Sequence, residues 1–171
     1  MINNYLNEIY RILKAGGGIY MFTAREDNGF FIREAEKIGF QYNHQIVLVK
    51  DNPLPHFTKT NFRSSFELCF YMSKGKPKTF NFLAQNKMIN KFHYLIGRKD
   101  TIHPTEKPIK MFRWLIEVSS NKGDLVFDGF LGSGTTAVAC KELGRKCIGI
   151  EISPEYCKIT KQRLSQEVLN F

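Results

Sequence analysis

The sequence has no run of 18 or more apolar residues, so no transmembrane helix is predicted. Its first residues lack the charged and then apolar pattern of a signal peptide, so we expect a cytoplasmic protein. The cysteines form no Cys-x-x-Cys pair and have no spacing typical of metal ligands, so no metal site is expected. They lie in apolar segments and are predicted to be buried, reduced thiols: Cys69, Cys140, Cys147 and Cys157.

Acidic residues are scarce in the middle of the chain. From Lys50 to Arg113 there are 13 Lys and Arg against 4 Asp and Glu, whereas the rest of the chain has 12 of each. The whole net charge of +9 therefore comes from one segment. Such clustering favours a surface that faces a polyanion such as a nucleic acid. The alternative is a solvated basic face that serves solubility only.

The stretch from Gly123 to Glu151 has the order strand, glycine-rich turn, helix and strand, which is half of a nucleotide-binding α/β unit. Its predicted parts are a buried strand at Leu125–Asp128, a turn with Gly129, Gly132 and Gly134, a helix at Thr135–Leu143 and a strand at Cys147–Ile150. Glycines let the backbone turn sharply and come close to a ligand. The alternative is an ordinary strand, turn and helix without a ligand.

The glycine-rich turn lacks the features that bind phosphates. Gly-Ser-Gly-Thr-Thr has no lysine before its hydroxyl residues, and the glycines do not follow the G-x-G-x-x-G spacing of a dinucleotide site. A cofactor with adenosine but no phosphate fits better, and S-adenosylmethionine is such a molecule. Glu151 ends the second strand about 20 residues after the turn, where an acid meets ribose hydroxyls in such folds. Phe130 and Ile152 would lie beside the adenine.

The rest of the chain alternates helix and strand, with one interruption. We expect helices at Asn3–Lys14 and Asp27–Ile38, strands at Ile19–Thr23, Phe40–Lys50 and Phe66–Met72, and a loop at Asp51–Ser64. The loop allows the Phe66 strand to pair antiparallel with the one before it. The pattern predicts one α/β domain, residues 1–171, with a mostly parallel sheet and one antiparallel strand near an edge.

Residues 74–102 have no regular pattern and combine basic with aromatic residues, including Phe80, Phe82, Phe92 and Tyr94. This combination suits phosphate contacts and stacking on bases, although the aromatics could equally pack the segment onto the domain. A helix then runs to about Ser120, with Thr105 as its expected N-cap. Lys107 and the N–H groups at this helix start could hold the carboxylate of the methionine moiety.

Three motifs in this order resemble one enzyme family. They are His103-Pro-Thr-Glu-Lys-Pro, Asp128-Gly-Phe-Leu-Gly-Ser-Gly-Thr-Thr and Glu151-Ile-Ser-Pro-Glu-Tyr. Together they are similar to the β class of amino DNA methyltransferases. The resemblance implies a Rossmann-like fold and S-adenosylmethionine-dependent methylation of the exocyclic amine of adenine or cytosine, on a base flipped from double-stranded DNA, as in restriction–modification.

The resemblance assigns roles to parts of the chain. Residues 1–73 would form the substrate side of the sheet, 74–102 a short target-recognition region and 103–171 the cofactor half. The expected cofactor-binding residues are His103, Thr105, Lys107, Asp128, Gly129, Phe130, Gly132, Ser133, Gly134, Thr135, Glu151 and Ile152. The expected DNA-binding residues are Lys59, Arg63, Lys76, Lys78, Lys87, Lys91, Arg98 and Lys99.

One motif of the family is missing. Its members use an Asp/Asn/Ser-Pro-Pro-aromatic tetrapeptide to accept hydrogen bonds from the target amine, and this sequence has no Pro-Pro pair. We therefore name no catalytic residue and expect the catalytic strand to be absent. The chain could be truncated and inactive alone, a partner chain or second copy could supply the segment, or the chain could be a non-catalytic module that binds nucleic acid and S-adenosylmethionine.

Overall fold

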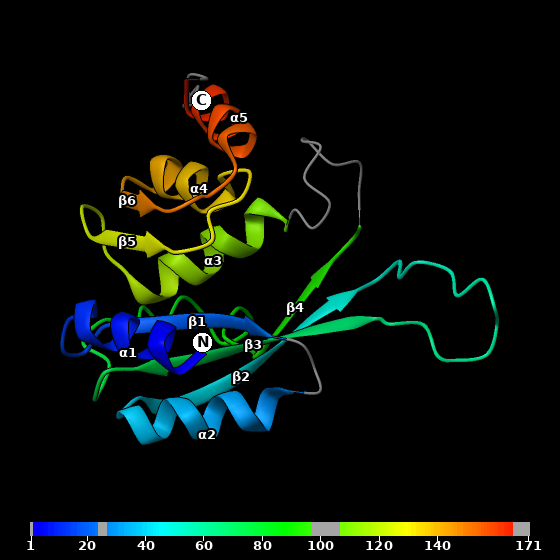
Figure 1. The fold of residues 1–171 in the computed structure, drawn as a ribbon, viewed down its shortest axis with the longest axis horizontal. Coiled ribbons are helices and arrows are strands. Elements are labelled where there is room, and N and C mark those ends of the chain that lie inside the picture. Colours follow the sequence, from blue (N-terminus) through cyan, green and yellow to red (C-terminus); the bar gives the residue numbers. More distant parts are fainter. Residues whose placement is uncertain (1, 24–26, 97–106, 166–171) are drawn as a thin grey trace. The chain divides into compact units, whose positions relative to one another are not determined.

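The computed structural model describes residues 2–23, 27–96 and 107–165, and the chain divides into two compact units, Met1–Ile96 and Gly97–Phe171. Each unit is described by itself (Figure 1). No helix among the described residues is long and apolar enough to cross a membrane.

The first unit is built on a four-stranded sheet in the order β1-β3-β2-β4. The strands are β1 (Gly18–Thr23), β2 (Gln41–Lys50), β3 (Phe66–Ser73) and β4 (Lys91–Tyr94). β3 lies between β1 and β2 and runs antiparallel to both, whereas β4 pairs parallel with the end of β2. One strand therefore opposes the others, next to the edge strand β1, as predicted.

Helices α1 (Ile2–Ile12) and α2 (Asn28–Ile38) pack against β3 through one apolar core. Its buried residues are Leu6, Ile9, Ala35, Phe40, Phe70 and Met72. Gly39 ends α2 with a φ of 115°, and its N–H donates to the carbonyls of Ala35 and Glu36. A positive φ favours glycine, and the helix ends at Ile38 as predicted.

The second unit contains α3 (Ile109–Ser119), β5 (Leu125–Asp128), α4 (Thr135–Leu143), β6 (Lys146–Gly149) and α5 (Pro154–Ser165). β5 and β6 pair in parallel, with Val126 beside Cys147 and Phe127 beside Ile148. Val126 and Cys147 pack against the buried Ile116 of α3 and Ala139 and Cys140 of α4.

The opposite face of the β5–β6 pair is exposed. Its side chains are Leu125, Phe127, Ile148 and Ile150. The prediction of a buried strand at Leu125–Asp128 was therefore wrong: Leu125 and Phe127 are exposed and Val126 and Asp128 are only half-buried, because α3 and α4 cover only the face that bears Val126 and Cys147.

Two other expectations need correction. β4 was missed, because its four residues, Lys-Phe-His-Tyr, are too few to show a period in the sequence. Only Cys69 and Cys140 are buried, while Cys147 and Cys157 are half-buried. Hydrogen bonding to Cys147 and burial raise the pKa of the Cys140 thiol, so this thiol stays protonated at neutral pH.

Candidate cofactor site

The turn after β5 is fixed by the last residue of that strand. The Oδ1 atom of Asp128 accepts a hydrogen bond from the N–H of Phe130 at 2.9 Å, and its Oδ2 atom accepts one from the hydroxyl of Thr136. One carboxylate thus joins the strand end, the turn and the first turn of α4. In this structure the role of Asp128 is to hold the glycine-rich turn against α4.

Backbone contacts bring the turn against the end of β6. The N–H of Leu131 donates to the carbonyl of Ile150 at 2.9 Å, and the N–H of Gly134 donates to the carbonyl of Leu131 at 3.0 Å. Gly132 and Gly134 have φ values of 56° and 84°, a region that side chains rarely adopt. A Cβ at Gly134 would also lie 2.6 Å from the side chain of Thr160. The left-handed conformation and the approach of Thr160 therefore favour glycine in this turn.

Glu151 follows β6 and faces the glycine-rich turn. Its Oε2 atom accepts a hydrogen bond from the N–H of Gly132 at 2.8 Å, and its Oε1 atom accepts one from the N–H of Ser153 at 2.8 Å. These bonds fix both carboxylate oxygens in a half-buried position at the strand end. A carboxylate oxygen accepts more than one hydrogen bond, so the same group can also receive hydroxyl donors of a ligand.

Two large apolar side chains, one in the turn and one after Glu151, are exposed. Phe130, in the glycine-rich turn, is 76% exposed, and Ile152, directly after Glu151, is 97% exposed. Covering such surfaces with a flat apolar ring would remove them from water, which is favourable by roughly 25 cal/mol per Å². Their predicted contact with adenine stays a prediction.

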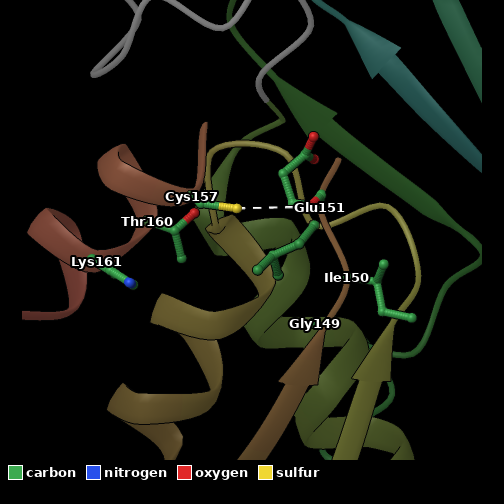
Figure 2. Close-up of a pocket in the computed structure, with 7 residues that line it drawn as sticks. Gly149, Ile150, Glu151, Cys157, Thr160 and Lys161 are labelled. Carbon is green, nitrogen blue, oxygen red and sulfur yellow. Dashed lines mark hydrogen bonds between the residues drawn. The ribbon is translucent and has the colours of Figure 1, made fainter. Parts of the chain in front are cut away.

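A hollow of about 380 Å³ lies beside Glu151 on the side of α5. It is lined by Leu131, Gly149, Ile150, Glu151, Cys157, Thr160 and Lys161. Figure 2 shows Cys157, Thr160 and Lys161 on α5, across from the segment of Gly149 and Glu151. The Sγ atom of Cys157 lies 3.7 Å from the Glu151 carbonyl. The hollow gives this end of β6 room for a ligand.

Residues of α5 hold the glycine-rich turn, a role that was not predicted from the sequence. The hydroxyl of Thr160 donates to the Gly132 carbonyl at 3.2 Å. The Nη1 atom of Arg163 donates to the Ser133 carbonyl at 2.9 Å and lies 3.3 Å and 3.4 Å from the hydroxyls of Ser133 and Thr135. Both hydroxyl residues are buried beneath Arg163. A partner 28 to 30 residues away leaves no local signal in the sequence.

The residues predicted for the methionine end of the cofactor are only partly described. His103 and Thr105 lie outside the described residues, as does the N-cap role expected of Thr105. The N-cap of α3 is Pro108, and Lys107 is half-buried just before it. The buried face of α3 contains Met111, Leu115, Ile116 and Val118.

The predicted DNA-binding residues that the structure describes are all exposed and lie in the first unit. Lys59 and Arg63 are in the connection between β2 and β3, Lys76 and Lys78 follow β3, Lys87 precedes β4, and Lys91 begins it. Arg98 and Lys99 lie outside the described residues. Their roles stay predictions. Among the described residues, no group of three or more His, Cys, Asp or Glu could hold a metal ion.

Polar side chains meet where β2 and β4 end and β3 begins. Lys50 forms an ion pair with Glu67 at 2.8 Å, with both side chains mostly covered. Burial, together with the Glu67 carboxylate, raises the pKa of Tyr94 to about 12. His93 lies 2.7 Å from the carboxylate of Asp51. These polar contacts therefore hold the two ends of the connection between β2 and β3 against the sheet.

Comparison with known proteins gives consistent matches over this architecture. The family model described as "DNA methylase" matches residues 1–162. The chain is 32% identical to the orphan methyltransferase M.BamHII of Bacillus amyloliquefaciens, over 95% of this chain and 80% of that protein. It is 30% identical to the type II methyltransferase M.HpaI of Haemophilus parainfluenzae, over 99% of this chain but only 60% of that protein.

Solved structures match the fold as well. The crystal structure of an M1.HpyAVI–SAM complex superposes with a TM-score of 0.87 at 30% identity, covering 96% of this chain and 82% of that one. The cytosine-N4-specific PvuII DNA methyltransferase superposes with a TM-score of 0.84 at 18% identity, covering 99% of this chain and 71% of that one. The second match concerns the fold alone.

Proposed function

Because this chain belongs to the DNA methylase family, we propose that its second unit binds S-adenosylmethionine at the glycine-rich turn and Glu151. Membership confirms the resemblance to amino DNA methyltransferases seen in the sequence, with the Rossmann-like fold, DNA methylation and restriction–modification that it implied. DNA is the substrate of such enzymes.

The observation that carries the proposal is the pair of hydrogen bonds that orient Glu151. Gly132 N–H and Ser153 N–H hold the two carboxylate oxygens at the end of β6, on the border of the hollow. A carboxylate fixed in this way is suited to accept hydrogen bonds from the two ribose hydroxyls of adenosine. The acid does not need to be reorganised when the ligand arrives, which favours binding.

Other residues would complete the site. Phe130 and Ile152 present apolar surface to the adenine, and Lys107 offers a positive charge for the carboxylate of the methionine moiety. Asp128, Ser133, Thr135, Thr160 and Arg163 would act through the turn, since their hydrogen bonds are made within it. Bound S-adenosylmethionine supplies an electrophilic methyl group, and this chain's residues would orient it.

We name no acceptor for the protons of the target amine. The 171 residues contain no Pro-Pro pair, and so no tetrapeptide of the family's type. Four strands could receive an additional one, because among the described strands β1 bonds only to β3, β4 only to β2, and β5 and β6 only to each other. We propose that a segment outside these residues, a partner chain or a second copy supplies the missing strand. A cytoplasmic location agrees with a DNA substrate and is part of this proposal.

Titration calorimetry of the 171-residue chain with S-adenosylmethionine tests the cofactor site. We expect Glu151→Ala to weaken binding by roughly 1–3 kcal/mol, because it leaves the ribose hydroxyls without the acceptor that they would bond to. Glu155→Ala, an exposed acid in the first turn of α5, serves as the control and should leave the affinity unchanged. Equal affinity of the wild type and Glu151→Ala would refute the site.

A second function is favoured by the missing tetrapeptide, namely a module that binds cofactor and nucleic acid without chemistry. A methyl-transfer assay with labelled cofactor and duplex DNA separates the two. Transfer that appears only when a Pro-Pro-aromatic segment is added, as an extended chain or a partner, supports the enzyme. Binding of DNA with steep salt dependence, and no transfer with either addition, supports the module.

A further inference from the structure

The connection between β2 and β3, residues 51–65, projects from the end of the first unit's sheet (Figure 1). We call these residues the β2–β3 finger. It carries two phenylalanines that make almost no contact with the rest of the protein, since Phe57 is 90% exposed and Phe62 is 95% exposed. Large aromatic side chains with this much surface in water usually mark a surface that binds something.

Hydrogen bonds within the finger give it a defined shape. The N–H of Lys59 donates to the His56 carbonyl at 3.2 Å and closes a turn that contains Phe57. The hydroxyl of Thr58 lies 3.1 Å from the His56 ring nitrogen and 2.9 Å from the Thr60 hydroxyl. Across the finger, the guanidinium of Arg63 donates to the carbonyls of Pro53 and Leu54. Phe57 and Phe62 are therefore presented by a shaped loop.

The base of the finger is tied to β4. The N–H of Asp51 donates to the Tyr94 carbonyl at 2.9 Å, and its carboxylate contacts His93. The side chain of Asn52 donates to the Ile96 carbonyl at 2.8 Å and accepts from the Ile96 N–H at 2.6 Å. These contacts anchor the base of the finger to β4 and to Ile96, which follows it.

The finger's composition identifies the chemistry of its partner. Residues 52–65 contain no Asp or Glu, two cations, Lys59 and Arg63, and five hydroxyl or amide side chains beyond Asn52, namely Thr58, Thr60, Asn61, Ser64 and Ser65. Lys59 stands at a φ of 54°, where glycine would be less strained, so its charged side chain is placed at the turn at a conformational cost. Donors and cations around two bare aromatic rings match a phosphate backbone with stacked bases.

We propose that the β2–β3 finger is a DNA-binding wedge, in which Phe57 and Phe62 stack on or insert between bases of the duplex while Lys59 contacts a phosphate. The proposal rests on the proposed function in DNA methylation and adds a surface to it. Enzymes that act on a base in a duplex must take it out of the stack, which costs a few kcal/mol. Apolar side chains that enter a base step offset part of this cost.

The test measures the affinity of the 171-residue chain for a labelled mixed-sequence DNA duplex by fluorescence anisotropy. The double variant Phe57→Ala/Phe62→Ala should bind about tenfold or more weakly, given that stacking on an aromatic is worth about 1–3 kcal/mol per base. Phe30→Ala, a partly exposed phenylalanine on α2 in the same unit, is the matched control and should bind as the wild type does. Circular dichroism and thermal unfolding check that each variant is folded.

A second variant separates stacking from charge. Lys59→Asn keeps a residue that tolerates positive φ and removes the cation, so the salt dependence of DNA binding should fall by about one phosphate contact. The phenylalanine variant should keep the wild-type salt dependence. Lys14→Asn, an exposed lysine just after α1, is the control.

Three outcomes would overturn the proposal. One is unchanged duplex affinity in Phe57→Ala/Phe62→Ala, another is a wild-type chain that binds no duplex, and the third is a change in oligomeric state on light scattering without a change in DNA affinity. The third would mean that the finger binds a second copy of the chain. None of these results affects cofactor binding, so the wedge and the cofactor site can fail independently.

Discussion

The Nη1 atom of Arg163 donates a hydrogen bond to the backbone carbonyl of Ser133 at 2.9 Å, which joins α5 to the glycine-rich turn. The Ser133 residue is buried, so its carbonyl depends on this partner for hydrogen bonding. Arg163→Ala should lower the free energy of unfolding by about 1–3 kcal/mol, the cost of an unsatisfied buried acceptor. Chemical denaturation measures this change, and calorimetry should show weaker cofactor binding.

Lys158→Ala on the same helix is the control for Arg163→Ala, because Lys158 is exposed. It should change neither stability nor affinity measurably. If Arg163→Ala kept both values of the wild type, α5 would not support the turn.

The conformation of Gly134 gives a second prediction. Gly134 and Gly123 have similar φ values, 84° and 88°, but only at Gly134 would a Cβ meet another side chain, that of Thr160 at 2.6 Å. Gly123→Ala should therefore cost about 1–2 kcal/mol for the left-handed conformation alone. Gly134→Ala should cost a further 1–3 kcal/mol or so for overpacking. Equal losses on denaturation would show that Thr160 moves aside without cost.

The core of the first unit depends on α1. Leu6 is fully buried between α1, α2 and β3. Leu6→Ala should lower the free energy of unfolding by about 2–5 kcal/mol, because it removes buried methyl groups and leaves a cavity. Ile12→Ala, at the exposed end of the same helix, should cost far less. Similar losses in urea denaturation would mean that α1 does not pack as described.

Tyr94 predicts a loss of stability at alkaline pH. Its pKa of about 12 lies above the ordinary value of 10, so the fold favours the neutral phenol. This contribution to stability is complete below pH 10 and is lost as the pH rises toward 12. In ultraviolet titrations, the phenol that is missing in Tyr94→Phe should be one that ionises near pH 12. A missing phenol that ionises near pH 10 would contradict the burial of Tyr94.

Local patterns in the sequence predicted most of the fold. Helices α1 and α2 and strand β2 are each indicated by neighbouring residues, and each lies close to its predicted range. β4 was not predicted, since a four-residue strand becomes a strand only by pairing with β2. Its partner lies more than 40 residues earlier, beyond the reach of any local pattern.

The sequence predicted the path of the backbone at the candidate site better than the contacts of its side chains. The glycines and Glu151 follow from the order of strand, turn, helix and strand, and the structure brings them within hydrogen-bond distance. The sequence could not show that Ser133 and Thr135 are engaged by Arg163, because that contact depends on how α5 packs. The shape of the β2–β3 finger was also hidden, since the loop prediction contained no information on the exposure of Phe57 and Phe62.

Side chains alternate along β5 and β6, so residues on one face of this strand pair can be substituted without changing the other face. Val126 and Cys147 point into the core with α3 and α4, whereas Leu125 and Ile148 are in water. Charged residues introduced at Leu125 and Ile148 would raise solubility and leave the packed interior intact. The same charges would oppose the packing of a further strand or helix on that face. The more soluble variant would therefore no longer bind a segment that covers Leu125 and Ile148.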